Sequence, residues 1–212
     1  MKHIQRICLK NSKQRQLILL KILTSINWSN LWKSKLTNAE LGGQKEKLKM
    51  NKVNEKGIEL LHNFEKLRFR AYDDAQPNVV LTEKTVIKGH LTIGWGQTGK
   101  WIKWDSQIDK IKADELFLES LQYAESIVKK LIKVPLNDNQ YSALVSFAYN
   151  SGGGYISKRY NKWTPYELWR FINEKKDGLK VKWLSTAVTS KGKPLKGLIN
   201  RRTAEYELFM SE

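Results

Sequence analysis

The chain has little that could bind a metal ion or form a covalent cross-link. Cys8 is the only cysteine among 212 residues, so no disulfide can form within the chain. The three histidines, His3, His62 and His90, are widely separated and lack the close ligand spacing of a zinc site. We therefore expect no metal and no other cofactor.

Long apolar runs are also missing. The most apolar stretch, residues 17–32, contains Lys21 and several Ser, Thr and Asn residues. It falls short of the roughly 20 apolar residues that cross a bilayer. Basic residues before LILLKIL give this stretch the outline of a signal peptide, but Lys21 and the lack of a small-x-small cleavage site argue against export.

Acidic residues are scarce, with 21 Asp and Glu against 38 Lys and Arg, which gives a net charge of +17. Such an excess predicts an anionic partner or surface, and nucleic acid, anionic lipid and anionic glycan satisfy it equally well. The content of 41% hydrophobic and 10% aromatic residues is enough for a packed core, so wholesale disorder is excluded.

The charge divides the chain into two parts. Residues 1–49 hold eleven Lys and Arg against Glu40 and Glu46, a net charge of +9. Gly42-Gly43 and the run QKEKLK then precede Met50, which could itself be the native start. We predict a boundary at about residue 50, with a basic N-terminal extension in residues 1–49 and the main domain in residues 50–212.

The extension has the pattern of a basic amphipathic helix. Its apolar positions are Leu17, Leu20, Leu23, Trp28, Leu31 and Trp32. Such a helix is a plausible binder of anionic membrane or lipopolysaccharide surfaces. The alternatives are an extra helix packed on the domain and an upstream segment with no role of its own.

The main domain is predicted to be α+β and predominantly helical, with a small β-sheet after its first helix. Helical apolar spacing and capping residues predict helices over residues 54–67, 112–133, 137–151, 165–175 and 198–210. The third helix is capped by Asn137 or Asp138, and the fourth opens on a capping box at residues 164–167. Residues 68–100, with four glycines and the runs NVVLT and LTIGW, predict the sheet.

The spacing of two acidic residues indicates a catalytic function. Glu65 closes the first helix, Asp74 follows in AYDD, and the glycine-punctuated run LTIGWG comes after it. An acid at a helix end and a second carboxylate on the next turn suit hydrolysis of a glycosidic bond, which uses two carboxyl groups. Asp73 is the rival of Asp74, and because neighbouring side chains in extended chain point to opposite sides, only one should face the cleft.

Four segments, in this order, resemble the signatures of phage-type lysozymes, the endolysins of tailed bacteriophages. They are FEKLRFRAYDD (64–74), LTIGWGQTG (91–99), VPLNDNQYSALVSFAYNSGGG (134–154) and PLKGLINRRTAEYELF (194–209). The resemblance implies a lysozyme-like fold and cleavage of the β-1,4 bond between N-acetylmuramic acid and N-acetylglucosamine in peptidoglycan. It covers about residues 57–209 and says nothing of residues 1–49.

The family's catalytic residues fall on Glu65, Asp74 and Thr92. Glu65, partly withdrawn from water beside Phe64 and Leu67, would protonate the departing oxygen. Asp74, in a more open turn, would stay ionised on the other face of the sugar. The Thr92 hydroxyl would help Asp74 to hold the attacking water in an inverting reaction, and a retaining reaction is the alternative.

Supporting residues are also implied. Arg201, or else Arg202, would orient Glu65 as a bidentate partner; alternatively both arginines face solvent or pair with Glu205. Tyr149 and Asn150 could contact sugar. Many relatives have His where Gln97 stands, and Gln cannot act there as an acid or base. The stretch from Ala75 to Leu91 is longer than in the shortest relatives and predicts an extra hairpin at the cleft mouth.

Peptidoglycan is thus the expected partner, and we expect a monomer that stays in the host cytoplasm until a holin-type pore releases it. The competing functions are an infection-stage lysozyme carried in the virion, an inactive lysozyme-like domain, and a cationic protein that binds nucleic acid or anionic surfaces. The last leaves the Glu65, Asp74 and Thr92 spacing unexplained, so nucleic acid is not expected as the primary partner.

Overall fold

The computed structural model describes residues 51–190 and 192–212. The predicted basic helix of residues 1–49 and the predicted boundary at about residue 50 lie outside these residues. In the part of the chain that is described, no helix is long and apolar enough to cross a membrane.

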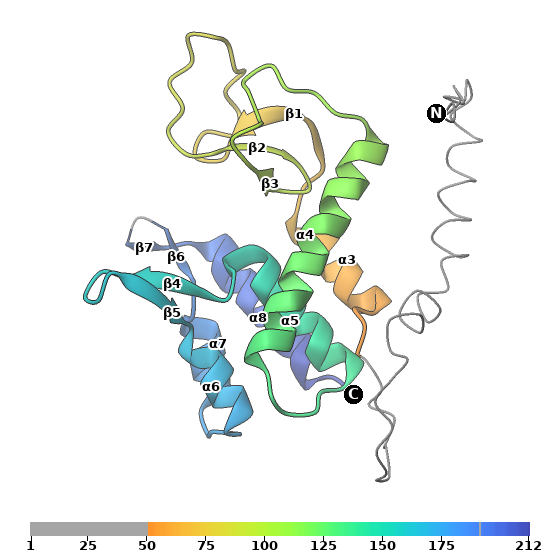
Figure 1. Ribbon diagram of the computed structural model, residues 1–212, viewed down its shortest axis with the longest axis vertical. Coiled ribbons are helices and arrows are strands. Elements are labelled where there is room, and N and C mark those ends of the chain that lie inside the picture. The colour runs from red at the N-terminus through yellow and green to blue at the C-terminus, as the bar shows by residue number, and fades with distance from the viewer. Residues whose placement is uncertain (1–50, 191) are drawn as a thin grey trace, which may run out of the picture. The chain divides into compact units, whose positions relative to one another are not determined.

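The described chain is predominantly helical, with three small antiparallel sheets. In chain order the elements are α3 (Glu55–Phe64), β1 (Arg68–Asp73), β2 (Leu91–Gly94), β3 (Gln97–Thr98), α4 (Lys110–Leu131), α5 (Asp138–Ser151), β4 (Gly154–Ser157), β5 (Lys162–Pro165), α6 (Glu167–Asn173), α7 (Leu179–Ser185), β6 (Thr189–Ser190), β7 (Lys193–Pro194) and α8 (Lys196–Met210). The β1–β3 sheet lies at one end, α5 to α8 lie at the other, and α4 connects the two (Figure 1). The predicted α+β class is confirmed.

Helix α5 is the centre of the main core. Its residues are buried on every side, from Asn139 and Tyr141 through Ala148, because α3, α4 and α8 all pack against it. Trp183 of α7 is fully buried and meets the rings of Phe147 and Phe209. Removing a buried aromatic side chain of this size typically costs about 3–5 kcal/mol of stability.

The first sheet has its own small core. β2 pairs with β1 on one side and with β3 on the other, and Tyr72 lies opposite Thr92. Ala71, Ile93 and Ile102 are buried together beneath it. Helix α4 contacts both β2 and β3, so the long helix fixes the sheet relative to the α5 core.

Side-chain caps explain where three helices begin. Asn54, Asp109 and Asn137 each accept a hydrogen bond from a backbone N–H in the first turn of α3, α4 and α5. Asn137 and Gln140 form a full capping box. Of the two predicted caps, Asn137 is therefore the residue used.

Two local predictions are wrong. Thr164 and Pro165 do not open a helix: they belong to β5, which pairs with β4, and α6 begins after Tyr166 without a side-chain cap. The segment between β1 and β2 does not form an extra hairpin either. It holds turns and no strand, NVVLT included, because β1 pairs directly with β2 and leaves this segment as the connecting loop.

Candidate active site

Glu65 lies at the junction of α3 and β1. It is the residue that ends α3, and its backbone N–H donates to the carbonyl oxygen of Leu61 at 2.8 Å, closing the last turn. Its side chain is only 16% exposed, as the sequence predicted for an acid at the edge of the core. Glu65 has extended backbone angles, and β1 begins three residues later at Arg68.

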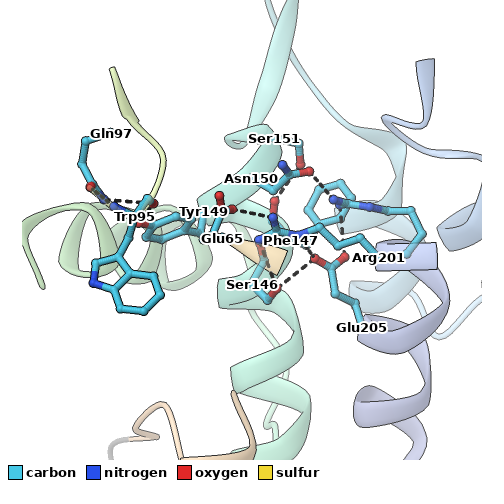
Figure 2. A network of polar contacts seen from close by, with 11 residues as sticks. Glu65, Trp95, Gln97, Ser146, Phe147, Tyr149, Asn150, Ser151, Arg201 and Glu205 are labelled. Carbon is cyan, nitrogen blue, oxygen red and sulfur yellow. Dashed lines mark hydrogen bonds and ion pairs between the residues drawn. The ribbon is translucent and has the colours of Figure 1, made fainter. Parts of the chain in front are cut away.

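Arg201 of α8 holds the Glu65 carboxyl group. Its Nη1 donates to Glu65 Oε1 at 2.5 Å, while its Nε donates to Glu205 Oε1 at 3.1 Å (Figure 2). The guanidinium group therefore bridges two carboxylates and is not bidentate to Glu65 alone. Neither Arg201 nor Arg202 faces solvent, and both pair with Glu205.

Glu205 organises this network from inside the core. It is fully buried and accepts a hydrogen bond from Ser146 Oγ of α5 at 2.9 Å. Arg202 Nη1 lies 3.1 Å from Glu205 Oε2, and Arg202 also donates to Asn150 Oδ1. Buried charges are tolerated where they are paired, and two carboxylates here face two guanidinium groups.

Two glycines of LTIGWG let the turn between β2 and β3 approach Glu65. Gly94 and Gly96 have φ angles of +66° and +87°, in the left-handed region that glycine adopts without strain. A Cβ atom on Gly96 would lie 2.6 Å from Glu65 Oε2, so only glycine fits beside the carboxyl group. The motif therefore serves a close backbone approach as well as a turn.

The structure separates the two neighbouring aspartates. Asp73 is fully buried, and its carboxylate accepts from the backbone N–H groups of Ala75, Gly89 and Lys88 at 3.0, 2.9 and 2.6 Å. Burial acts to raise its pKa, but these backbone donors outweigh burial and hold the pKa below the ordinary value. Asp73 is thus committed to shaping the loop.

Asp74 is the more open of the two, with its side chain 45% exposed. Its Oδ1 accepts from the backbone N–H of His90 at 2.7 Å. The carbonyl oxygen of His90 accepts a hydrogen bond from Thr92 Oγ1 at 3.2 Å. The His90 backbone thus connects Asp74 with Thr92, which is 3% exposed on β2.

Gln97 joins the sheet to α5. Its Nε2 donates to Tyr149 Oη at 2.7 Å, its Oε1 accepts from the backbone N–H of Trp95 at 2.7 Å, and Tyr149 Oη donates to the Trp95 carbonyl oxygen at 2.9 Å (Figure 2). Burial, and to a lesser extent the negative charge of the nearby Glu65, raises the pKa of the Tyr149 phenol well above its ordinary value. The hydroxyl group therefore stays a donor, and the link carries no charge.

A hollow of about 500 Å³ opens beside this link. It is lined from the sheet by residues 96–98 and from the helices by Glu119, Ser120, Tyr123, Ala148, Tyr149 and Gly152. A larger hollow of about 980 Å³ lies between β1, residues 77–81 and residues 104–107, and neither Glu65 nor Asp74 lines it. Neither carboxylate lines the smaller one either, but Gly96 does, and a Cβ atom there would lie 2.6 Å from Glu65 Oε2, so the smaller hollow comes within one residue of Glu65.

No group of three or more His, Cys, Asp or Glu in residues 51–190 and 192–212 is placed to hold a metal ion. The carboxyl groups at the site are engaged by an arginine and by backbone N–H groups. The arrangement can position one carboxyl group in a partly buried setting and a second in an open one.

The phage lysozyme family model matches residues 62–205, from α3 to α8. The chain belongs to the phage lysozyme family. The endolysin of Bacillus phage PZA is 33% identical over 159 residues, covering 75% of this chain and 55% of the relative, and that of Bacillus phage B103 is 33% identical over 163 residues, covering 75% and 54%. The chain thus spans little more than half the length of these two relatives.

Solved structures of phage lysozymes and related domains share the fold. The endolysin of Escherichia coli O157:H7 phage FAHEc1 has a TM-score of 0.56 at 28% identity and covers 76% of this chain and 94% of that one. The muramidase domain of SpmX from Asticaccaulis excentricus has a TM-score of 0.57 at 25% identity, with 77% and 100% covered. The lysozyme-like fold predicted from the sequence is confirmed.

Sequence reasoning missed the inner part of the site. Contact of Arg201 with Glu65 was expected, and pairing of both arginines with Glu205 was the alternative; the structure has both. The hydrogen bonds of Ser146 to Glu205 and of Arg202 to Asn150 were not foreseen. The signal available was the pair of arginines three and four positions before a glutamate, NRRTAE, which by itself reads as an exposed helical ion pair.

Proposed function

We propose that this phage lysozyme is an endolysin that hydrolyses the β-1,4 bond between N-acetylmuramic acid and N-acetylglucosamine in peptidoglycan. One observation carries the proposal: Arg201 holds the partly buried Glu65 beside Gly96, while the His90 backbone holds Asp74 in an open turn. Two carboxyl groups in unlike settings are what acid-assisted glycoside cleavage needs.

In the proposed reaction Glu65 donates its proton to the glycosidic oxygen as the bond from that oxygen to the anomeric carbon breaks. The leaving sugar departs as an alcohol, and Arg201 stabilises the carboxylate that remains on Glu65. Positive charge develops on the ring of the other sugar. The Asp74 carboxylate, more exposed than Glu65, stabilises that charge from the opposite face.

Asp74 could complete the reaction in either of two roles, as a base or as a nucleophile. As a base it would take a proton from a water molecule that attacks the anomeric carbon, with Thr92 helping to hold that water, and the product would be inverted. As a nucleophile it would form a covalent ester that water then hydrolyses with retention. Proton NMR of the first-formed anomer distinguishes the two roles.

Gln97, Tyr149 and Asn150 are proposed to support the sugar-binding surface. The Gln97 and Tyr149 polar atoms are engaged with each other and with Trp95, so they shape the wall of the cleft. Asn150 accepts from Arg202 through its oxygen, which leaves its exposed NH₂ group to donate to a sugar hydroxyl or acetamido group.

The test is Glu65→Gln, which removes the proton while nearly preserving shape. We expect cleared zones on a peptidoglycan zymogram and new muramic acid reducing ends from the wild type and none from the variant, with equal melting temperatures. A variant within about tenfold of the wild-type rate, equivalent to ~1.4 kcal/mol in the barrier, would show that another group is the acid.

We further propose that residues 1–49 form an extension separate from the catalytic domain, which begins at about residue 50, and that the extension binds anionic membrane. Its net charge of +9 supports this. A fragment of residues 50–212 should then keep activity on purified peptidoglycan and lose binding to phosphatidylglycerol vesicles. Equal vesicle binding by both forms would contradict the role.

For localisation we propose that the protein stays in the host cytoplasm until a holin-type pore releases it. Expression without a holin should not lyse cells promptly. Prompt lysis that depends on the Sec pathway would instead identify the first residues as an export segment, and recovery of the protein in purified virions would favour the infection-stage role.

A further inference from the structure

The β4–β5 hairpin carries an unusual amount of exposed apolar surface. It leaves the helical body where α5 ends (Figure 1), and Tyr155, Ile156, Tyr160 and Trp163 on it are between 48% and 61% exposed. Between residues 154 and 165 the chain has three basic residues and no acidic one. Contiguous exposed apolar surface with a polar rim is typical of binding sites.

One face of the hairpin turns toward α4. Ile156 and Trp163 are cross-strand partners, so their side chains share a face, whereas Tyr155 lies on the other face and packs against Tyr166. The Trp163 indole lies beside Gly153, where a Cβ atom would also meet Ile127 and Leu131 of α4. Trp163 is therefore brought against the C-terminal half of α4 while half of it stays exposed.

Helix α4 continues this surface to the cleft. Tyr123, Ile127 and Lys130 are four and three positions apart and thus share one face of the helix. Tyr123 lines the hollow beside Gln97 at one end, and Lys130 Nζ lies 5.9 Å from the Trp163 ring at the other. Along one face of α4 these residues connect the smaller hollow with the hairpin, and Ile127 between them is partly buried against the core.

We propose that these five residues, Tyr123, Ile127, Lys130, Ile156 and Trp163, form an accessory track that binds the glycan strand of peptidoglycan beyond the catalytic cleft. The proposal rests on the proposed function, since the ligand is the same polymer that the cleft would cleave. The direction of the track follows from its start at the smaller hollow: a glycan strand that leaves the hollow past Tyr123 meets Trp163 next.

The chemistry of the track fits such a strand. β-linked hexosamine rings expose axial C–H groups on their flat faces, and these pack against indole and phenol rings with loss of water from both. The peptides on muramic acid carry carboxylates, which the amines of Lys130, Lys158 and Lys162 and the guanidinium of Arg159 would attract. An anionic membrane surface would use the same residue types, but an elongated stripe continuous with a cleft suits a linear polymer better.

The experiment uses the whole 212-residue protein and compares a polymeric glycan with a short oligosaccharide as ligand and substrate. Trp163→Ala combined with Ile156→Ala should bind purified long glycan strands about tenfold more weakly in cosedimentation, ~1.4 kcal/mol. On insoluble peptidoglycan kcat/KM should fall by a similar factor, and on a soluble tetrasaccharide that fills only the cleft it should not change. Trp101→Ala is the matched control, because its indole is 50% exposed in the loop after β3 and outside the track.

Each contrary result has a separate meaning. Equal losses on tetrasaccharide and polymer, or polymer binding no weaker than in the Trp101→Ala control, overturn the track. Weakened binding to phosphatidylglycerol vesicles with unchanged glycan binding overturns it in favour of a membrane surface. Where the double variant melts early, Ile156→Ala alone decides, because that residue is 61% exposed and its truncation leaves the core intact.

Binding is measured in a Glu65→Gln background on ice, so that the polymer stays whole. If that variant still cleaves, the proposed catalytic assignment fails. The ratio of glycan binding between track variant and control still reports on the track.

Discussion

Arg201 and Glu65 lie 136 positions apart in the chain and meet at 2.5 Å between Nη1 and Oε1. The contact joins the last helix to the residue that ends α3, and it is backed by Glu205, which accepts from Arg201 Nε inside the core. The orientation of the proposed acid therefore depends on an ion pair that is almost wholly excluded from water, where loss of one partner leaves the other uncompensated.

Arg201→Ala should consequently damage both stability and activity. It strips a partner from Glu205, and truncating one member of a buried charge pair typically costs about 3–5 kcal/mol. Urea unfolding should show a loss of this size, and kcat should fall more than KM changes. Arg170→Ala is the control: its pair with Glu167 is half-exposed, and exposed pairs contribute about 1 kcal/mol or less.

Gly96→Ala should lower activity by displacing Glu65. The new Cβ atom would lie 2.6 Å from Glu65 Oε2 at a φ of +87°. Gly178→Ala is a matched control, because its φ is +78° and a Cβ atom there meets nothing within 4 Å. Both changes should cost about 1–2 kcal/mol of backbone strain, measured by denaturation, and only the first should reduce kcat. Equal kcat values would mean that the carboxyl group tolerates the shift.

The two aspartates should respond oppositely to replacement by asparagine. Asp74→Asn should abolish activity at an unchanged melting temperature, since its side chain is half-exposed and supports little of the loop. Asp73→Asn should lower the melting temperature, because an NH₂ group would replace an oxygen that accepts a backbone N–H. A thermally stable but inactive Asp73→Asn enzyme would move the catalytic role to Asp73.

Stability should decline as the pH falls through about 6.5 because of His62. Its ring stacks on Trp95 at 4.2 Å between centroids. Burial, and to a lesser extent the charge of Lys110, lowers the pKa of His62 below its ordinary value of 6.5. The unfolded chain then binds the proton more readily than the folded one, so folding is favoured above this pH and opposed below it. Urea unfolding between pH 8 and 5 should show the decline, and His62→Gln should flatten it. If the free energy of unfolding of His62→Gln fell with pH as steeply as that of the wild type, a group other than His62 would be responsible.

The sequence predicted the elements whose stability is local. Helices α3, α4, α5 and α8 begin and end within a few residues of the predicted bounds, because periodic apolar positions and caps such as Asn137 act within one helix. Glu65 and Asp74 could be chosen as candidates because the motif that contains both is continuous in the chain.

Features that depend on distant partners could not be predicted in the same way. Thr164 and Pro165 read as a helix start, but pairing with Tyr155 and Gly154 makes them a strand. The burial of Arg202 and Glu205 likewise follows from α8 packing against α5. On an isolated helix the same residues would be a surface ion pair.

The placement of Arg201 on the final helix has a consequence for the chain during its synthesis. Glu65 and Asp74 are made before α8, from Lys196 to Met210, which brings both Arg201, the partner of the proposed acid, and Phe209 of the core. A chain interrupted by premature termination or cut by a protease before α8 would contain both carboxyl groups. It would lack Arg201, the partner of Glu65. We therefore expect the proposed hydrolytic activity to appear only after α8 has been made and has packed against α5.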